Sequence, residues 1–222
     1  MIQRLATLAP MTAFLIFGAT GNAYAGGRSE PWQMWLQPAA SPVMERITEF
    51  HTLLFIIEVS IVILVLGLLC YIIVRFNAKA NPVPTKTTHN TLLEVVWTGV
   101  PLLILIVIAV PSLKLLYYSD RIENAEMTLK VTGNQWFWSY SYPDHGGFEF
   151  DSVIVPDDEL KVGQPRLLTV DNEVVLPAET NIRLLVTSAD VIHDWAVPAL
   201  GVKLDTVAGR INETWLRINK EG

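Results

Sequence analysis

Two long apolar runs, separated by a short polar loop, constrain this chain more than any other feature. The run from Thr52 to Val74 has 23 residues with one charge, and the run from Val95 to Leu113 has 19 residues with none. About 20 apolar residues cross the hydrocarbon core of a bilayer. With 51% hydrophobic residues, the whole chain is also too apolar for an ordinary soluble domain. The sequence therefore predicts a transmembrane helical hairpin within residues 51–118.

The polar loop at residues 75–90 gives the hairpin an orientation. It carries Arg75, Lys79 and Lys86 and no acidic residue, which predicts a cytoplasmic loop by the positive-inside rule. Residues 1–25 combine a basic start, an apolar stretch and Ala-Tyr-Ala before Gly26, the pattern of a cleaved signal peptide. An additional membrane helix is the alternative interpretation of residues 1–25. Cleavage would export residues 26–50, an amphipathic lead-in with several prolines.

Beyond Arg121 the pattern changes to short alternating runs typical of β-strands. The segment MTLKVTGNQWFWSYSYP alternates polar and apolar residues, and RLLTVDN, NIRLLVTS and ETWLRI follow between turn residues. This spacing predicts an antiparallel sandwich or barrel. Within one continuous strand, Trp136 and Trp138 would point to one face and Phe137 to the other. The aromatic residues are then either core packing or, on an exposed face, a link between a redox centre and a partner.

The exported part is acidic. Residues 119–222 contain 17 Asp and Glu against 9 Lys and Arg, which argues against nucleic acid as a partner and is compatible with a basic protein. A charge run is usually a solvated surface, but beside aromatic residues it can also be a docking surface for a basic electron carrier. The acidic residues after the aromatic run are Asp144, Glu149, Asp151, Asp157, Asp158 and Glu159.

Three ionisable residues and the single cysteine bear on what sites the chain can form. His193 follows a strand-like run and is either a structural residue or a metal ligand, since an imidazole in a loop after a strand supplies the first copper ligand of cupredoxin-type folds. Cys70 lies in the first apolar run, so the chain can build no disulfide and no Cys-x-x-Cys site. Glu94, just before the second run, is an interfacial acid or a proton uptake group. Glu58, inside the first run, must face protein or water, which predicts a larger membrane complex.

Three segments carry a resemblance to a known family. The segment HNTLLEVVWTGVPLLILIVIAVPSLKLLY resembles its second helix, VTGNQWFWSYSYP its aromatic stretch, and VDNEVVLPAETNIRLLVTSADVIHDWAVPALGVKLDTVAGRINETW its copper domain. From about residue 31 to residue 222, the chain resembles subunit II of the aa3-type haem-copper cytochrome c oxidases. The resemblance implies a membrane helical hairpin followed by an all-β cupredoxin-like sandwich over residues 119–222. It also implies a two-pass protein of an alphaproteobacterial inner membrane, with the soluble domain in the periplasm.

The resemblance implies specific roles. Such a subunit accepts electrons from cytochrome c at a dinuclear copper centre and passes them to haem in subunit I for oxygen reduction coupled to proton translocation, in a complex that also contains subunit III. Trp136 matches the tryptophan that first accepts the electrons, and His193 matches the first copper ligand. Glu94 matches the carboxylate at the mouth of a proton channel. The six acidic residues named above would form the docking surface for cytochrome c.

The sequence also departs from the family pattern. Asn134 stands where a histidine is frequent, Phe137 where a tyrosine is frequent, and Asp194 where a small or uncharged residue is usual. The family's remaining copper ligands (two cysteines, a glutamate, a second histidine and a methionine) follow the point at which this sequence stops. We therefore expect a sandwich that is incomplete at its C-terminus, in a fragment, a split subunit or a copper-free form.

Two other functions stay open at this point. One is a copper-free structural or assembly subunit, and the other is subunit II of a quinol oxidase. His193 and Trp136 favour electron transfer over the quinol interpretation, because a quinol oxidase needs neither residue.

Overall fold

The computed structural model describes residues 27–83, 85–120 and 124–221. The chain divides into two compact units, Met1–Pro38 and Ala39–Gly222. The described part of the first unit consists of turns and bends without a helix or strand. The predicted signal peptide lies outside the described residues.

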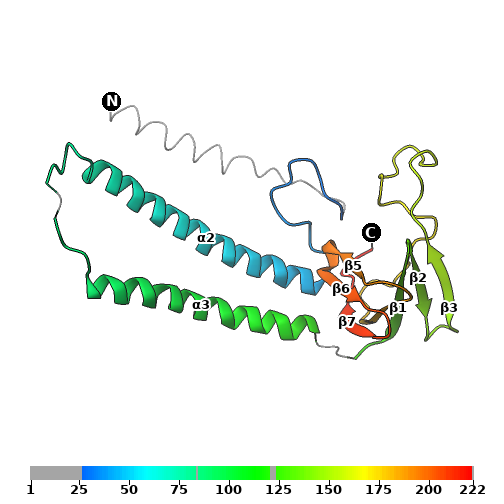
Figure 1. Ribbon diagram of the computed structural model, residues 1–222. Coiled ribbons are helices and arrows are strands. Elements are labelled where there is room, and N and C mark those ends of the chain that lie inside the picture. The colour runs from blue at the N-terminus through cyan, green and yellow to red at the C-terminus, as the bar shows by residue number, and fades with distance from the viewer. Residues whose placement is uncertain (1–26, 84, 121–123, 222) are drawn as a thin grey trace. The chain divides into compact units, whose positions relative to one another are not determined.

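Two long helices, α2 (Pro42–Arg75) and α3 (Thr91–Asp120), contact each other as a hairpin (Figure 1). At 1.5 Å per residue they measure about 50 and 45 Å, more than the roughly 30 Å of a bilayer core. Both are apolar enough to cross a membrane, which confirms the predicted hairpin. The helix begins within the predicted lead-in, where Ser41 caps α2 and Pro42 is its first residue. Residues 42–50 are therefore helical.

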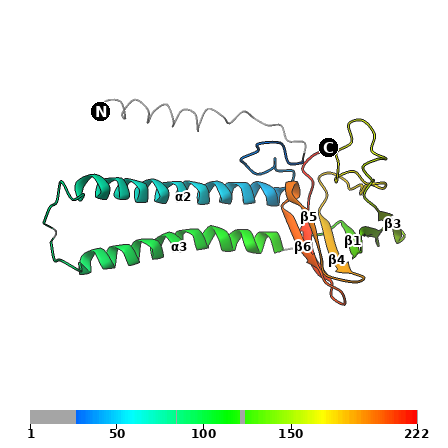
Figure 2. The same cartoon turned by 45° about the horizontal axis from the view of Figure 1, so that its top comes forward.

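The β domain consists of two sheets. The larger has the strand order β3-β2-β1-β4-β7 and the smaller pairs β5 with β6 (Figures 1 and 2). A short 3-10 helix, η1 (Pro198–Leu200), connects β5 to β6. The strands are β1 (Met127–Asn134), β2 (Phe137–Tyr142), β3 (Phe148–Ser152), β4 (Ile182–Ser188), β5 (His193–Val197), β6 (Val202–Thr206) and β7 (Asn212–Leu216).

The larger sheet is mixed, which corrects the prediction of an antiparallel sandwich. β1 pairs with β4 in parallel register, from Met127 opposite Ile182 to Gly133 opposite Ser188. Parallel neighbours need a long crossover, and here β2, β3 and the loop at residues 153–181 provide it. Strands β1 and β4 therefore both end at the same edge of the domain.

The aromatic segment is a hairpin and not one continuous strand. β1 ends at Asn134 and β2 begins at Phe137, so Gln135 and Trp136 form the turn between them. The prediction that Trp136 shares a strand face with Trp138 is wrong. Trp138 instead shares one face of β2 with the buried Tyr140 and Tyr142, and this face packs against the core.

The other strand predictions had mixed outcomes. The segments NIRLLVTS and ETWLRI contain β4 and β7, as predicted. RLLTVDN forms no strand, and only Val170 within it makes an isolated bridge, with Ile154. His193 was predicted in a loop but is the first residue of β5.

The hydrophobic core lies between the two sheets. Alternate residues of β1 and β4 are fully buried, including Leu129, Val131 and Leu184, and Trp195 and Val202 of the smaller sheet pack against them. Period-two burial is what a strand with one covered face produces. The predicted all-β sandwich is therefore confirmed.

Hydrogen bonds fix the first helix to the sandwich. The Ser41 hydroxyl is fully buried, accepts a hydrogen bond from the Met44 N–H at 2.9 Å and donates one to the Leu200 carbonyl at 2.6 Å. Ala40 is bonded through its backbone to Ala199 and Asn219. The start of α2 is thus both a helix cap and a contact with the turn before β6.

The second helix is fixed to β7. The Trp215 indole donates to the Tyr118 carbonyl at 3.0 Å, and the Thr214 hydroxyl donates to the Ser119 carbonyl at 3.0 Å. Satisfying the last carbonyls of a helix in this way is a general requirement at helix ends. Both helices therefore meet the sandwich at the same end of the hairpin.

We predict that Gly201→Ala destabilises the junction more than Gly209→Ala. Both glycines have positive φ, at 68° and 76°, so each alanine costs about 1–2 kcal/mol of backbone strain. At Gly201 the new Cβ would also lie 2.8 Å from Ile47 Cδ1 and 3.1 Å from the Met44 backbone, whereas nothing lies within 4 Å at Gly209. Overpacking adds about 1–3 kcal/mol. Thermal unfolding in detergent, followed by near-ultraviolet circular dichroism, measures the difference, and equal melting temperatures would contradict the packing at this junction.

Candidate functional site

His193 lies at the edge of the domain where β1 and β4 end, and its ring is held on two sides. The ring makes an edge contact with Trp138, with centroids 5.8 Å apart, and the side chain is 16% exposed. A Cβ at Gly133 would lie 2.7 Å from His193 Cδ2, so the ring rests directly against that backbone. Gly133 and Trp138 are paired residues of β1 and β2. The hairpin therefore fixes the position of the imidazole.

Asp190 joins the loop before His193 to the turn that carries Trp136. Its carboxylate lies 2.6 Å from His193 Nε2 and accepts hydrogen bonds from the backbone N–H groups of Gln135 at 2.8 Å and Val191 at 2.6 Å. The hydrogen bond with His193, followed by those from the two backbone groups, lowers the pKa of Asp190 to about 2. The sequence interpretation missed Asp190, although an Asp in a turn frequently accepts hydrogen bonds from nearby backbone N–H groups.

Trp136 projects from the turn between β1 and β2. Its side chain is 85% exposed, so core packing does not apply to this tryptophan. Other aromatic residues of the domain do pack in the core. The Trp195 indole donates a hydrogen bond to the Tyr140 hydroxyl at 3.1 Å, and burial raises the pKa of Tyr140. The structure thus separates one exposed indole from a buried aromatic cluster.

The described residues do not fit a dinuclear copper centre by themselves. No group of three or more His, Cys, Asp or Glu in the described ranges could hold a metal ion. Cys70 lies in α2, away from the sandwich, and the Nε2 atom of His193 already bonds Asp190. Asp194 forms an ion pair with Lys203. Copper centres of this kind use soft thiolate ligands, and the described residues place no thiolate beside His193.

The six predicted docking acids are all exposed, and they follow the hairpin β2–β3 and the turn after it. Glu149 and Asp151 share one face of the edge strand β3. Three of the six have partners, since Asp144 accepts from the Thr128 N–H, Asp151 accepts from the Ser139 hydroxyl, and Asp157 pairs with Arg166, each at 2.6 Å. Asp158 and Glu159 lie in the turn beside Asp157.

Glu94 and Glu58 lie in the helices and not beside His193. Glu94 is in the first turn of α3, at the end of the hairpin opposite the sandwich, and its N–H bonds the Asn90 carbonyl at 3.0 Å. Because α3 is about 45 Å long, the structure does not bring Glu94 to the other predicted site residues. Glu58 is exposed on α2, next to Ile57, which lines an apolar groove of about 260 Å³ against α3.

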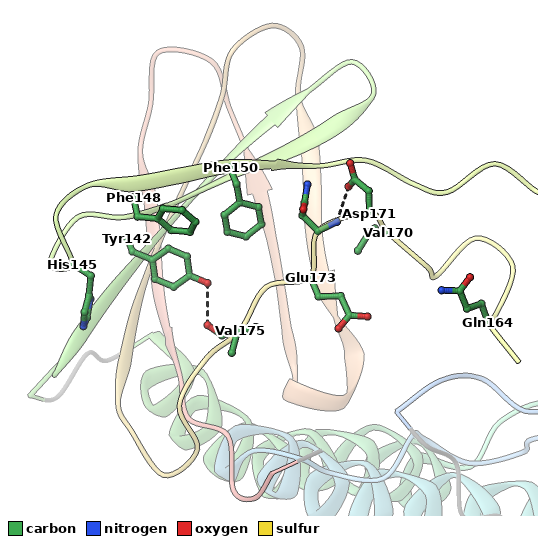
Figure 3. Close-up of a pocket in the computed structure, with 10 residues that line it drawn as sticks. Tyr142, His145, Phe148, Phe150, Gln164, Val170, Asp171, Glu173 and Val175 are labelled. Atoms are coloured by element: carbon green, nitrogen blue, oxygen red, sulfur yellow. Dashed lines mark hydrogen bonds between the residues drawn. The ribbon is translucent and has the colours of Figure 1, made fainter. Parts of the chain in front are cut away.

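A cavity of about 900 Å³ lies beside β2 and β3 (Figure 3), and none of the predicted site residues lines it. Its wall is formed by Tyr142, Phe148 and Phe150, whose rings stack, and the Tyr142 hydroxyl donates to the Val175 carbonyl at 3.0 Å. Its charged or chargeable side chains His145, Asp171 and Glu173 extend from different places around the cavity (Figure 3). They do not form an acid–base pair, so this cavity offers no catalytic arrangement.

Comparison with known proteins identifies relatives for both parts of the chain. Residues 29–115 match the family described as cytochrome c oxidase subunit II, transmembrane domain, and residues 127–222 match its periplasmic domain. The probable cytochrome c oxidase subunit 2 of Rickettsia bellii is 52% identical over 192 residues, covering 86% of this chain and 71% of the relative. Cytochrome c oxidase subunit 2 of Zea mays is 44% identical over 200 residues, covering 87% and 77%.

The chain is shorter than these relatives. It spans 66%, 61% and 66% of the length of the probable cytochrome c oxidase subunits 2 of Rickettsia felis, R. conorii and R. prowazekii. A solved structure of the periplasmic domain of subunit II of cytochrome oxidase from Bradyrhizobium japonicum is 54% identical, with a TM-score of 0.43, covering 46% of this chain and 70% of that chain.

We predict that Asp190→Ala loosens the turn that carries Trp136. The substitution removes the acceptor of the Gln135 N–H, so we expect exchange of this amide with solvent to become about tenfold faster. Hydrogen exchange of the purified chain measures this rate. Asp158→Ala is the matched control, because Asp158 is also an exposed aspartate but lies in a turn far along the chain from Gln135. An unchanged rate at Gln135 would show that Asp190 does not hold the turn.

Proposed function

The chain belongs to the cytochrome c oxidase subunit II family, and from this premise we propose that it accepts electrons from cytochrome c and passes them toward haem in subunit I for oxygen reduction coupled to proton translocation. The observation that supports this proposal most strongly is the arrangement around Trp136. The exposed indole extends from a turn whose backbone is bonded to Asp190, and Asp190 also bonds His193. A surface aromatic residue and a fixed imidazole are thus connected through one carboxylate.

The arrangement suits electron transfer because it is preorganised. Trp138 and Gly133 hold the imidazole from two sides, so its position does not depend on a bound partner. Trp136 remains free to contact a partner, since no other side chain covers most of its surface. In this proposal Trp136 is the first acceptor of the electron, and the hairpin β1–β2 fixes it relative to His193.

His193 is proposed as the donor that this chain gives to a copper centre. The described residues supply no thiolate beside it, since Cys70 lies in α2. The role proposed for the described residues is therefore to present Trp136 and to hold the imidazole in place.

The proposed docking surface consists of the six acidic residues on β2–β3 and the following turn. Their exposure and the excess of acids over bases in residues 119–222 favour a basic partner such as cytochrome c. The basic loop at residues 75–90 lies at the other end of the hairpin, which supports a periplasmic sandwich on the bacterial inner membrane.

Glu94 is proposed as the carboxylate at the mouth of a proton channel. Its position in the first turn of α3, beside the loop at residues 75–90, places it on the cytoplasmic side in this orientation. Subunits I and III are the proposed neighbours in the membrane. Exposure of Glu58 within α2 supports a protein neighbour there, because a carboxylate in contact with lipid is costly.

We predict that Trp136→Phe slows electron transfer from reduced cytochrome c in the assembled oxidase on the order of tenfold, equivalent to about 1.4 kcal/mol of barrier. Phenylalanine keeps an aromatic ring on the turn but lacks the indole that donates and accepts the electron. Stopped-flow oxidation of cytochrome c measures the rate. Trp32→Phe, an equally drastic change at a side chain that is 97% exposed, is the control. Normal rates in the Trp136 variant would disprove its role as the first acceptor.

We predict that Glu149→Gln raises the Michaelis constant for cytochrome c about two- to fivefold at low salt, the range expected for one exposed charge pair. The effect should fade as ionic strength rises, because screening acts over about 8–10 Å near physiological salt. Glu179→Gln is the matched control, since Glu179 is exposed but precedes β4 at the end of the sheet near the helices. If both variants behave alike, the docking surface does not lie on β3.

A further inference from the structure

We propose that the cavity between the outer ends of α2 and α3 and the sandwich binds the phosphate of an anionic phospholipid. The cavity has a volume of about 600 Å³ and is lined by residues of both helices and of the segments around β4 and β7. Three of the lining side chains are cationic: Arg46 of α2, Lys114 of α3 and Arg217 just after β7. This inference does not rest on the proposed electron transfer.

The charge of the cavity has one sign. No Asp or Glu is among its lining residues. Within the described ranges, none of the three cations forms an ion pair with a carboxylate, and Arg46 instead lies over the Tyr118 ring, with its Cζ 3.4 Å from the centroid. Three cations facing one space repel one another unless an anion lies between them.

Three carboxylates next to the lining segments have hydrogen-bond or ion-pair partners other than the three cations. Glu45 accepts a hydrogen bond from Asn219 Nδ2 at 2.8 Å, Glu126 accepts one from the Asn181 N–H at 3.2 Å, and Glu213 pairs with Arg183. The described part of the chain therefore leaves the cations of the cavity available to an external anion. Guanidinium and ammonium groups together are the usual donors to a phosphate.

The depth of the cavity in the membrane points to a lipid. Lys114 directly follows the apolar run that ends at Leu113, so its ammonium lies at the boundary of the hydrocarbon core. Arg46 lies six residues before the other apolar run, or about 9 Å above that boundary. The cations therefore span the level of the lipid headgroups, where the phosphate of an anionic lipid can reach them.

Aromatic residues complete the site. Tyr117, Tyr118 and Trp215 line the cavity, and Tyr and Trp are enriched at the headgroup level of membrane proteins. The Tyr118 and Trp215 rings are in edge contact at 5.4 Å, which builds a rigid wall opposite the exposed Tyr117. An acyl chain attached to the bound phosphate would extend from this wall along the apolar surfaces of α2 and α3.

The test uses the full chain, purified in dodecyl maltoside and titrated with dioctanoyl phosphatidylglycerol, dioctanoyl phosphatidylcholine or glycerol 3-phosphate. Native mass spectrometry counts bound lipid, and tryptophan fluorescence gives the affinity. We expect one phosphatidylglycerol to bind in preference to phosphatidylcholine and to glycerol 3-phosphate. In Lys114→Gln/Arg217→Gln its affinity should fall about tenfold or more, because two charge-assisted hydrogen bonds are lost.

A matched double variant, Lys130→Gln/Lys161→Gln, removes the same charge outside the cavity and should bind phosphatidylglycerol normally. If the double variant of the cavity does not fold, Lys114→Gln alone gives the same comparison, since this side chain is exposed. Arg46 is left unchanged because its contact with Tyr118 holds the two helices together.

Several outcomes would overturn the proposal. Equal binding of the two lipids, or equal loss in both double variants, would exclude a specific headgroup site. Equal affinity for glycerol 3-phosphate would mean a site for soluble anions. If phosphatidylglycerol shows no preference and the cavity variant no longer co-purifies with the other oxidase subunits, the cations pair with a carboxylate of a partner protein.

Discussion

The hydroxyl of Ser41 makes the contact on which the rest of this structure depends. It accepts a hydrogen bond from the first turn of α2 and donates one to the turn before β6, while fully buried. A single side chain thus begins the membrane helix and fixes the sandwich to it. Trp215 and Thr214 provide the equivalent contacts for α3, so side chains join the hairpin and the β domain at three backbone carbonyls, those of Leu200, Tyr118 and Ser119.

The junction between the two helices and the sandwich determines where the candidate sites lie. β1 follows α3 in the chain, and the parallel pairing of β1 with β4 carries both strands away from the helices to one edge. That edge holds Trp136, Asp190 and His193, whereas the opposite end of the sheet holds the cationic cavity at the membrane surface. The domain therefore separates the surface proposed for a soluble redox partner from the cavity proposed for a lipid headgroup, with the core between them.

Local patterns in the sequence were sufficient for the hairpin, for β4 and β7, and for the choice of His193 and Trp136 as residues of interest. They were insufficient where long-range contacts decide the outcome. Nothing in the alternation of residues 127–142 distinguishes one strand from two, because Gln135 and Trp136 continue the pattern while forming a turn. RLLTVDN has strand-like composition but lies in a loop that lines the cavity beside β2 and β3, so its surroundings outweigh its β propensity.

The sequence by itself determined the membrane hairpin, the acidic β domain and the family, because hydrophobic length, charge and motif are properties of neighbouring residues. Only the tertiary structure decided that Asp190 connects the Gln135 N–H, in the turn that carries Trp136, to His193. Asp190 lies 55 positions from Gln135 in the sequence, and the two meet through the parallel pairing of β1 with β4. The tertiary structure also brought Arg46, Lys114 and Arg217 together from three distant segments. Sites of this kind depend on which chain segments pack side by side, and that is a property of the folded core.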